Sequence, residues 1–137
     1  MVHALEKIKQ LLKPGGALLD IHPTNELAAI TVRLDEQHIS AGWVYESDDY
    51  VEYEWADEAL QHVIDDRRFV VEQSGTFEFV WHAATLPELR AYLAEEWKDA
   101  IIDEVTAGRI EELLKSAAGE KEILIREVIR IARYRRT

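Results

Sequence analysis

A break in the sequence pattern near the start of the chain constrains the fold more than any other feature. Apolar residues recur at helical spacing over residues 3–13, which predicts an amphipathic helix. Pro14-Gly15-Gly16 follows directly; proline cannot continue the helix, and the glycines permit a sharp turn. Residues 17–22 then form a short apolar run that ends at Pro23-Thr24-Asn25, and we expect a buried strand there.

The next part of the chain predicts a hairpin and a helix. Apolar and polar residues alternate over residues 29–46, as in a half-buried two-stranded hairpin with Ile30, Val32 and Leu34 facing inward. The following apolar stripe has helical spacing and predicts a surface helix over residues 56–66.

Two stretches rich in β-forming residues, 69–74 and 76–81, flank Gly75. A single straight strand of that length would exceed the usual five or six residues, so we expect a bulge, a kink or a tight turn at Gly75. Thr85 and Glu88 have the spacing of a capping box and predict the start of a helix.

The last third of the sequence predicts one more helix and one more strand. The helix is expected over residues 103–117, with Val105 among its buried residues and Gly119 as its stop. Residues 123–134 are dense in β-branched side chains and predict a strand, although a helix also fits their spacing. We found no repeat and no linker, so residues 1–137 are expected to form a single domain.

Residues 4–22 read Ala-Leu-Glu-Lys-Ile-Lys-Gln-Leu-Leu-Lys-Pro-Gly-Gly-Ala-Leu-Leu-Asp-Ile-His. This stretch resembles a segment of class I S-adenosylmethionine-dependent methyltransferases, in which a helix ends at Leu-Lys-Pro-Gly-Gly and leads into the fifth strand of a seven-stranded sheet. The resemblance implies that 69–74 and 123–134 are the sixth and seventh strands, and that the hairpin is an insertion. The expected fold class is therefore α+β, a partial methyltransferase-like sheet in strand order 5-7-6 with an added β-hairpin and flanking helices.

The resemblance covers only the C-terminal half of that family's domain. The family binds its cofactor on a glycine-rich turn in the other half, and no Gly-x-Gly occurs in this chain. We therefore expect no cofactor for the chain alone, and S-adenosylmethionine only if a partner supplies the missing half. Strand 17–22 would lack its usual neighbour, and an exposed apolar edge invites pairing with another chain. We expect a homodimer through this edge; the alternative partner is a separately encoded N-terminal methyltransferase half.

Two polar residues and several aromatic residues are the candidates for a functional site. Asp20 and His22 lie at the C-terminal end of strand 17–22, where ligands bind in open α/β sheets, so His22 is the candidate general base or substrate contact. The alternative is a strand-end histidine that is hydrogen-bonded to a loop. The candidates for a substrate pocket, each of which has core or interface packing as its alternative, also include Trp43, Phe79, Trp81, His82, Tyr92 and Trp97.

Composition excludes several other classes of function. The net charge of −11 argues against nucleic-acid binding, which requires a positive surface. The absence of cysteine excludes disulfides and thiolate metal ligands, and the five histidines lack zinc-like spacing, so no metal is expected. No run approaches the roughly 18 apolar residues of a membrane span and no signal peptide is recognisable, so the protein is expected to be cytoplasmic, without a membrane partner.

The C-terminal arginines, Arg126 to Arg136, are expected to neutralise the protein's own acidic surface rather than to bind phosphate. Together these observations favour a truncated methyltransferase-like protein that is non-catalytic alone and self-associates. Two alternatives remain: the substrate-side half of a split methyltransferase, with His22 as base, and a stand-alone module that binds a small ligand.

Overall fold

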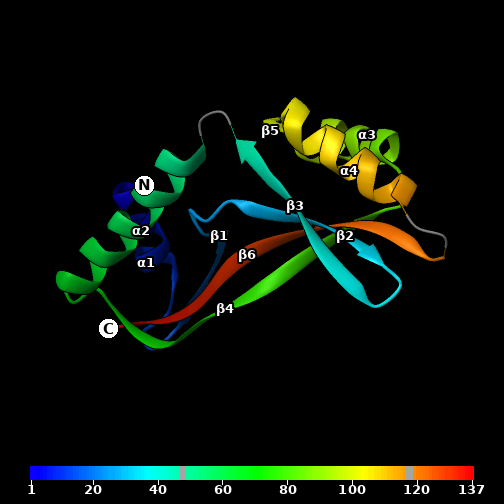
Figure 1. The fold of residues 1–137 in the computed structure, drawn as a ribbon. Helices are drawn as coiled ribbons and strands as arrows, with labels where there is room; N and C mark the ends of the chain where they lie inside the picture. The colour runs from blue at the N-terminus through cyan, green and yellow to red at the C-terminus, as the bar shows by residue number, and fades with distance from the viewer. Residues whose placement is uncertain (47–48, 117–118) are drawn as a thin grey trace. The chain divides into compact units, whose positions relative to one another are not determined.

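The structure is a computed structural model that describes residues 1–46, 49–116 and 119–137. In these residues the chain has an α+β fold of four helices and an antiparallel sheet of six strands (Figure 1). The elements, in chain order, are α1 (Val2–Leu11), β1 (Ala17–Pro23), β2 (Ala28–Leu34), β3 (Gln37–Glu46), α2 (Asp49–Asp65), β4 (Phe69–Ala83), α3 (Leu86–Glu96), β5 (Ala100–Ile101), α4 (Glu104–Ser116) and β6 (Lys121–Arg136).

Strand β6 organises the sheet because three other strands pair with it. Its C-terminal half pairs with β1, from Pro23 opposite Ile129 to Ala17 opposite Arg135. Its N-terminal half pairs with β2, and β4 also pairs with β6. The β2–β3 hairpin continues the sheet to the short β5, so the strand order is β1-β6-β2-β3-β5 with β1 at one end.

The chain divides into two compact units, and both β4 and β6 contribute residues to each of them. Unit 1 consists of Met1–Asn25, Asp49–Phe77 and Val128–Thr137, and unit 2 of Glu26–Asp48 and Glu78–Glu127. The expectation of a single domain stays a prediction.

In unit 1 the helices α1 and α2 cover one face of the sheet. Tyr134 and Phe69 lie at the centre of the core there, with Leu60 and Val63 of α2 and Leu5 of α1 packed against them. Leu18 of β1 packs against this core. Because side chains alternate along a strand, Asp20 and His22 lie on the same, helix-covered face as Leu18, whereas Leu19 and Ile21 lie on the other face.

In unit 2 the β2–β3 hairpin and the first half of β6 pack against α3 and α4. Ile30, Val32, Ile110, Ile123 and Ile125 are completely buried in this core. Helix α3 begins with the predicted capping box: the Glu88 amide donates to the Thr85 hydroxyl at 3.2 Å. The Glu88 carboxylate accepts from the amide of Ala84, one residue before the position expected.

The sequence predicted the helices and strands well, but several details were wrong. Strand 17–22 forms as β1, yet none of its residues is buried, and the side chains of Leu19 and Ile21 are 63% and 57% exposed. Residues 69–83 form one strand, so Gly75 is not a tight turn. Val105 is 83% exposed instead of buried.

Three further observations concern the limits and type of elements, and the first confirms a prediction. Residues 123–134 are a strand, β6, and the helical alternative is excluded. Helix α2 begins at Asp49, seven residues before the predicted start at Ala56. Val51, Tyr53 and Trp55 in its first turns alternate with glutamates instead of recurring at helical spacing, so the pattern did not predict a helix there. The hairpin turns over two residues, with Asp35 at a φ of 54°.

Candidate functional site

The predicted site residues fall into two groups. Asp20 and His22 belong to unit 1, and the aromatic candidates and His82 belong to unit 2. Within unit 2, the residues of β4 and α3 cluster together, whereas no ring contact joins Trp43 of β3 to that cluster in the described part of the chain. Each group is therefore treated as a separate candidate.

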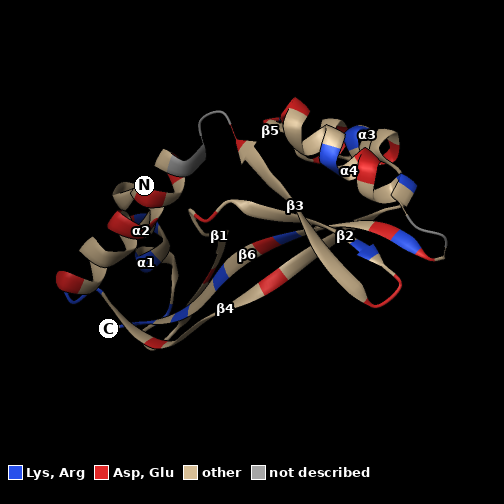
Figure 2. Ribbon diagram, viewed as in Figure 1, with Lys and Arg blue, Asp and Glu red and all other residues tan. Residues whose placement is uncertain are grey.

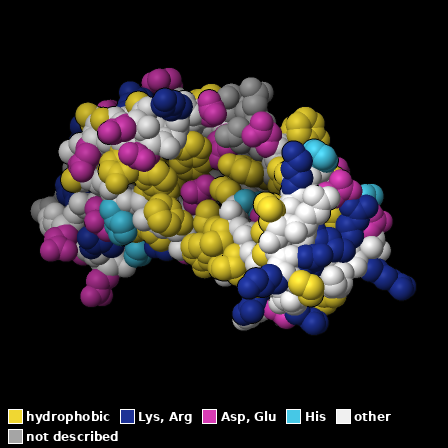
Figure 3. Space-filling model, turned by 180° about the vertical axis from the view of Figure 1, so that it is seen from behind, with side chains coloured by type: hydrophobic (Ala, Val, Ile, Leu, Met, Phe, Trp, Pro, Cys, Tyr) yellow, Lys and Arg dark blue, Asp and Glu magenta, His cyan; other side chains and the backbone are white. Residues whose placement is uncertain are grey.

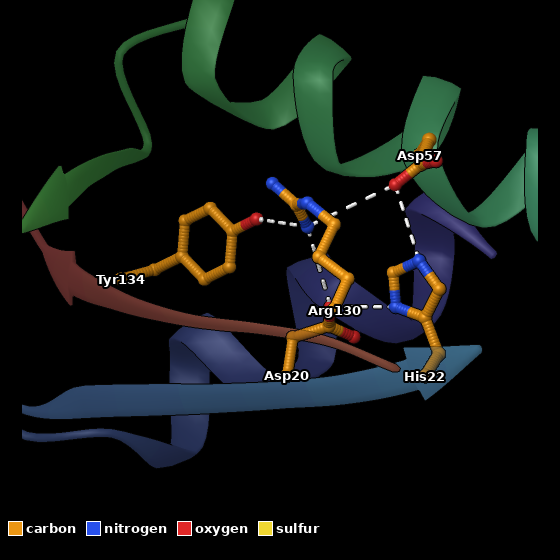
Figure 4. Close-up of polar contacts among 5 residues, drawn as sticks. All are labelled: Asp20, His22, Asp57, Arg130 and Tyr134. Atoms are coloured by element: carbon orange, nitrogen blue, oxygen red, sulfur yellow. Dashed lines mark hydrogen bonds and ion pairs between the residues drawn. The ribbon is translucent and has the colours of Figure 1, made fainter. Parts of the chain in front are cut away.

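In unit 1, His22 is held between two carboxylates (Figure 4). Its Nδ1 lies 2.7 Å from Oδ2 of Asp20 on the same strand, and its Nε2 lies 3.1 Å from Oδ1 of Asp57 on α2. The His22 side chain is only 12% exposed. A carboxylate accepts hydrogen bonds, so both contacts are complete when both ring nitrogens carry a proton.

Arg130 of β6 joins the same group of side chains. Its Nη1 donates to the Tyr134 hydroxyl at 3.1 Å and lies 3.6 Å from Asp20 and 3.8 Å from Asp57. Burial alone would lower the pKa of Arg130, but the hydrogen bond with Tyr134 and the two carboxylates raise it above its ordinary value. We call Asp20, His22, Asp57, Arg130 and Tyr134 the polar cluster.

The chemistry of the polar cluster differs from the expected role of His22. A general base needs a ring nitrogen that is free to accept a proton from a substrate. Here both nitrogens face carboxylates, so the geometry favours the alternative reading of a histidine held by hydrogen bonds, with partners on β1 and α2 in place of a loop. His22 as a base stays a prediction.

Sequence reasoning missed three members of the polar cluster: Asp57, Arg130 and Tyr134. Arg130 lies opposite His22 in the register of β1 and β6, which no local pattern of the sequence predicts. Asp57 comes from an acidic stretch in which nothing distinguishes one carboxylate from its neighbours.

In unit 2, Trp81 is the centre of an aromatic group built from β4 and α3. Phe79 and Tyr92 meet its ring edge to face, with centroids 5.5 Å and 5.4 Å away, and Trp97 stacks on it at 6.1 Å. A pocket of about 370 Å³ opens beside this group, and we call it the aromatic pocket; it is lined by Phe79, Val80, Trp81, His82, Tyr92 and Glu96. The structure thus brings together five of the predicted pocket residues. Phe79, Trp81, His82 and Tyr92 line the pocket, and Trp97 is outside the lining but stacks on Trp81.

Polar groups surround the aromatic residues. Burial raises the pKa of Glu127, and the Trp81 side chain opposes that shift. Nevertheless Nε1 of Trp81 is buried and makes no hydrogen bond of ordinary geometry within the described residues. On β6, Glu122 receives a hydrogen bond from Nδ1 of His82 at 3.1 Å; this bond, helped by Arg33, lowers the pKa of Glu122.

Arginines of β6 form ion pairs with acidic residues of β4; the ribbon in Figure 2 shows basic and acidic positions on these strands. Arg133 and Arg135 lie 2.9 Å and 3.0 Å from the two oxygens of Glu72 on β4, and Arg126 lies 3.2 Å from Glu78. These ion pairs support the expectation that the C-terminal arginines neutralise the protein's own acidic surface.

Other features of the described residues are weaker candidates for a functional site. A hollow of about 720 Å³ is lined by Met1, Val2, Glu52, Trp55, Glu58, Ala59 and His62. No His, Asp and Glu residues in the described ranges are arranged to hold a metal ion. None of the described helices combines the length and the apolar character that crossing a membrane requires.

Comparisons of this chain with protein-family models, with curated proteins and with solved structures found no match.

Proposed function

We propose that this chain is a cytoplasmic association module, a methyltransferase-like C-terminal half that is non-catalytic alone and pairs with a second copy through β1. The single observation that carries the proposal is the position of β1 at the end of the strand order, with the exposed side chains of Leu19 and Ile21 on it.

Two observations support the methyltransferase-like part of the proposal. Strand β6 pairs with both β1 and β4, as strand 7 does with strands 5 and 6 in the order 5-7-6. Helix α1 and β1 are joined by Pro14-Gly15-Gly16, with Gly15 at a φ of 75° that favours glycine.

The edge of β1 favours association because its outward backbone groups have no strand beside them among the described residues. Such an edge is a template for another strand. On its outer face, Leu19 and Ile21 are exposed next to Ile131 and Phe77, which are also exposed. On the face of the molecule drawn in Figure 3, exposed hydrophobic side chains gather in patches. A second copy needs only this chain's own residues, and a two-fold axis closes the pair.

Charge distinguishes two registers of this pairing, one centred on Asp20 and one centred on Ile21. If two copies of β1 pair around Asp20, the two Asp20 carboxylates lie opposite each other, and like charges in that position destabilise a sheet. If they pair around Ile21, the two Ile21 side chains meet, and Asp20 of each copy lies opposite His22 of the other. We therefore expect the register that is centred on Ile21.

Cysteine cross-linking tests both the dimer and its register, because the chain has no cysteine of its own. In the expected register the Ile21→Cys variant forms a disulfide-linked dimer under mild oxidation, since directly opposed residues lie within disulfide range. Leu19→Cys is the matched control, because it is equally exposed on the same face but lies opposite Pro23 in this register.

Light scattering gives the second readout. The unmodified chain should have the mass of a dimer, and Ile21→Lys should shift it to the monomer without loss of helix content, because Ile21 lies outside the core. A monomer at high concentration contradicts the proposal. Efficient cross-linking of Leu19→Cys alone contradicts the register but not the dimer.

The split enzyme is the second candidate, because the fourth strand of an N-terminal methyltransferase half would pair with this same edge of β1. Light scattering separates the two, because a half that requires an N-terminal partner stays monomeric on its own, and calorimetry with S-adenosylmethionine tests cofactor binding by the chain alone. Neither the chain nor its dimer should bind the cofactor, and tight stoichiometric binding by the chain alone would overturn the favoured function.

A further inference from the structure

The aromatic pocket of unit 2 has walls that are suited to a positive charge. Three aromatic side chains line it, and the rings of Phe79 and Tyr92 stand at 80° and 90° to that of Trp81. The π-faces of such rings carry partial negative charge, and they attract cations that lie over them, Trp most strongly.

The charged groups of the pocket point to the same conclusion. Glu96 is the carboxylate of the lining, and neither Lys nor Arg is among the lining residues. Glu96 and Glu95 end helix α3, whose last turn contains no basic residue. The C-terminal end of a helix is itself partly negative, so two acids placed there disfavour the helix unless a cation lies nearby.

We propose that the aromatic pocket binds a small organic cation of the alkylated ammonium class, with the methylated nitrogen over the aromatic rings and its charge balanced by Glu96. A pocket of about 370 Å³ has room for such a group but not for a large ligand. This site is independent of the β1 edge, so it stands or falls separately from the proposed dimer.

Other ligand chemistries fit less well. An anion would meet Glu96 and the negative end of α3. A neutral apolar molecule would bury the pocket face but leave Glu96 without a partner. An alkylated ammonium is hydrated more weakly than a bare ammonium, so it loses less on entering an apolar site, and aromatic cages recognise this class in other proteins.

The ligand series separates charge from shape. Tetramethylammonium and choline are titrated into the full chain and followed by tryptophan fluorescence and by the NMR signals of the indole NH groups. The control is 3,3-dimethylbutanol, which has the shape of choline with carbon in place of the charged nitrogen. We expect binding of both cations and at least tenfold weaker binding of the neutral analogue; equal binding of choline and the analogue overturns the proposal.

Matched variants then locate the site. We expect Glu96→Gln to weaken choline binding about fivefold and Tyr92→Leu about tenfold. Glu95→Gln removes the same charge from the same helix turn outside the lining, and Trp43→Leu removes an exposed tryptophan outside the aromatic group, so neither should change binding.

Folding of the variants is not at risk, because Glu96 and Tyr92 are both exposed. Equal losses from Glu96→Gln and Glu95→Gln overturn the proposal, since they show a general charge effect. Vesicles of phosphatidylcholine test the other source of the same chemistry. Binding to vesicles without binding of free choline also overturns the proposal of a small-molecule site.

Discussion

The two halves of strand β6 share the same extended backbone, but their side chains are buried in different patterns. In unit 2, three consecutive residues, Ile123, Leu124 and Ile125, are buried, so both faces of the strand are covered. In unit 1, buried Ala132 and Tyr134 alternate with exposed side chains. Residue type follows this difference, because Arg133 and Arg135 take exposed positions in the second half, whereas residues 123–125 of the first half are an uninterrupted apolar run. A strand that is covered on one face only can present its other face to a partner.

The largest expected effect tests this difference within one strand. Ile125→Ala removes a fully buried side chain in unit 2 and should lower the free energy of unfolding by about 3–4 kcal/mol. Ile131→Ala, at a position that is 36% exposed on the outer face of unit 1, should cost less than about 1 kcal/mol. Urea unfolding followed by circular dichroism measures both. Equal losses would contradict the contrast, because they would show that Ile131 is as important to the fold as the buried Ile125.

Two glycines, Gly42 in unit 2 and Gly75 in unit 1, differ in how tightly the neighbouring side chains pack around them. Gly42 of β3 has a φ of 148°, and a Cβ at this position would collide with the side chain of Thr106 on α4. Gly42→Ala should therefore destabilise the protein by about 1–3 kcal/mol. A Cβ added at Gly75 of β4 would have no atom within 4 Å. Gly75→Ala should therefore change stability by less than about 0.5 kcal/mol. Thermal unfolding of the two variants checks the contrast, and a large loss from Gly75→Ala would contradict it.

The arginines of β6 test the polar cluster against an ordinary surface ion pair. Arg130 contacts Tyr134, Asp20 and Asp57, and its removal leaves two carboxylates near each other, so Arg130→Ala should cost about 2 kcal/mol. Arg126 is similarly exposed and, among the described residues, forms an ion pair with Glu78, so Arg126→Ala should cost less than about 1 kcal/mol. Chemical denaturation compares them. Similar losses would mean that the polar cluster contributes no more than a surface pair.

The smallest expected effects concern two glutamates of β6 with opposite pKa shifts. His82 lowers the pKa of Glu122 below its ordinary 4.5, so Glu122 stabilises the fold above that pH, and the stabilisation is lost as the pH falls through the lowered value. Burial raises the pKa of Glu127, so its ionised form at pH 7 disfavours folding, and this cost disappears in acid.

Accordingly, Glu122→Gln should reduce stability at pH 7, and Glu127→Gln should increase it, each by less than about 1 kcal/mol because solvent screens both groups. Both differences from the unmodified chain should shrink when unfolding is measured at pH 3–4. Glu120→Gln is the control for Glu122, because its carboxylate is highly exposed at 3.7 Å from Arg33. A loss of stability from Glu127→Gln at pH 7 would contradict the assignment.

Much of the fold could be predicted from the sequence because its signals are local. The stop at Pro14-Gly15-Gly16, the alternation in the hairpin and the capping box at Thr85 each depend on a few neighbouring residues. The errors arose where burial depends on distant parts of the chain. Leu19 and Ile21 have the apolar character of a buried strand, and only the pairing and packing of β1 reveal that this face is exposed.

The candidate site could be predicted only in part, for the same reason. The aromatic residues could be listed from composition, but Glu96 enters the pocket because helix α3 places it beside Tyr92, and the sequence marks it no differently from Glu95. His22 could be placed at the end of a strand, whereas its partners Asp57 and Arg130 are 35 and 108 residues away along the chain.

The late position of β6 in the chain has a consequence for biosynthesis. Strands β1, β2 and β4 all precede it, so each is made before its common partner exists. Pairing over such long sequence separations is slow, and unpaired strand edges of incomplete chains are prone to aggregation. During translation Ala17–Pro23 remains without its neighbour until Lys121–Arg136 has been synthesised, which makes it a segment on which chaperones are expected to act.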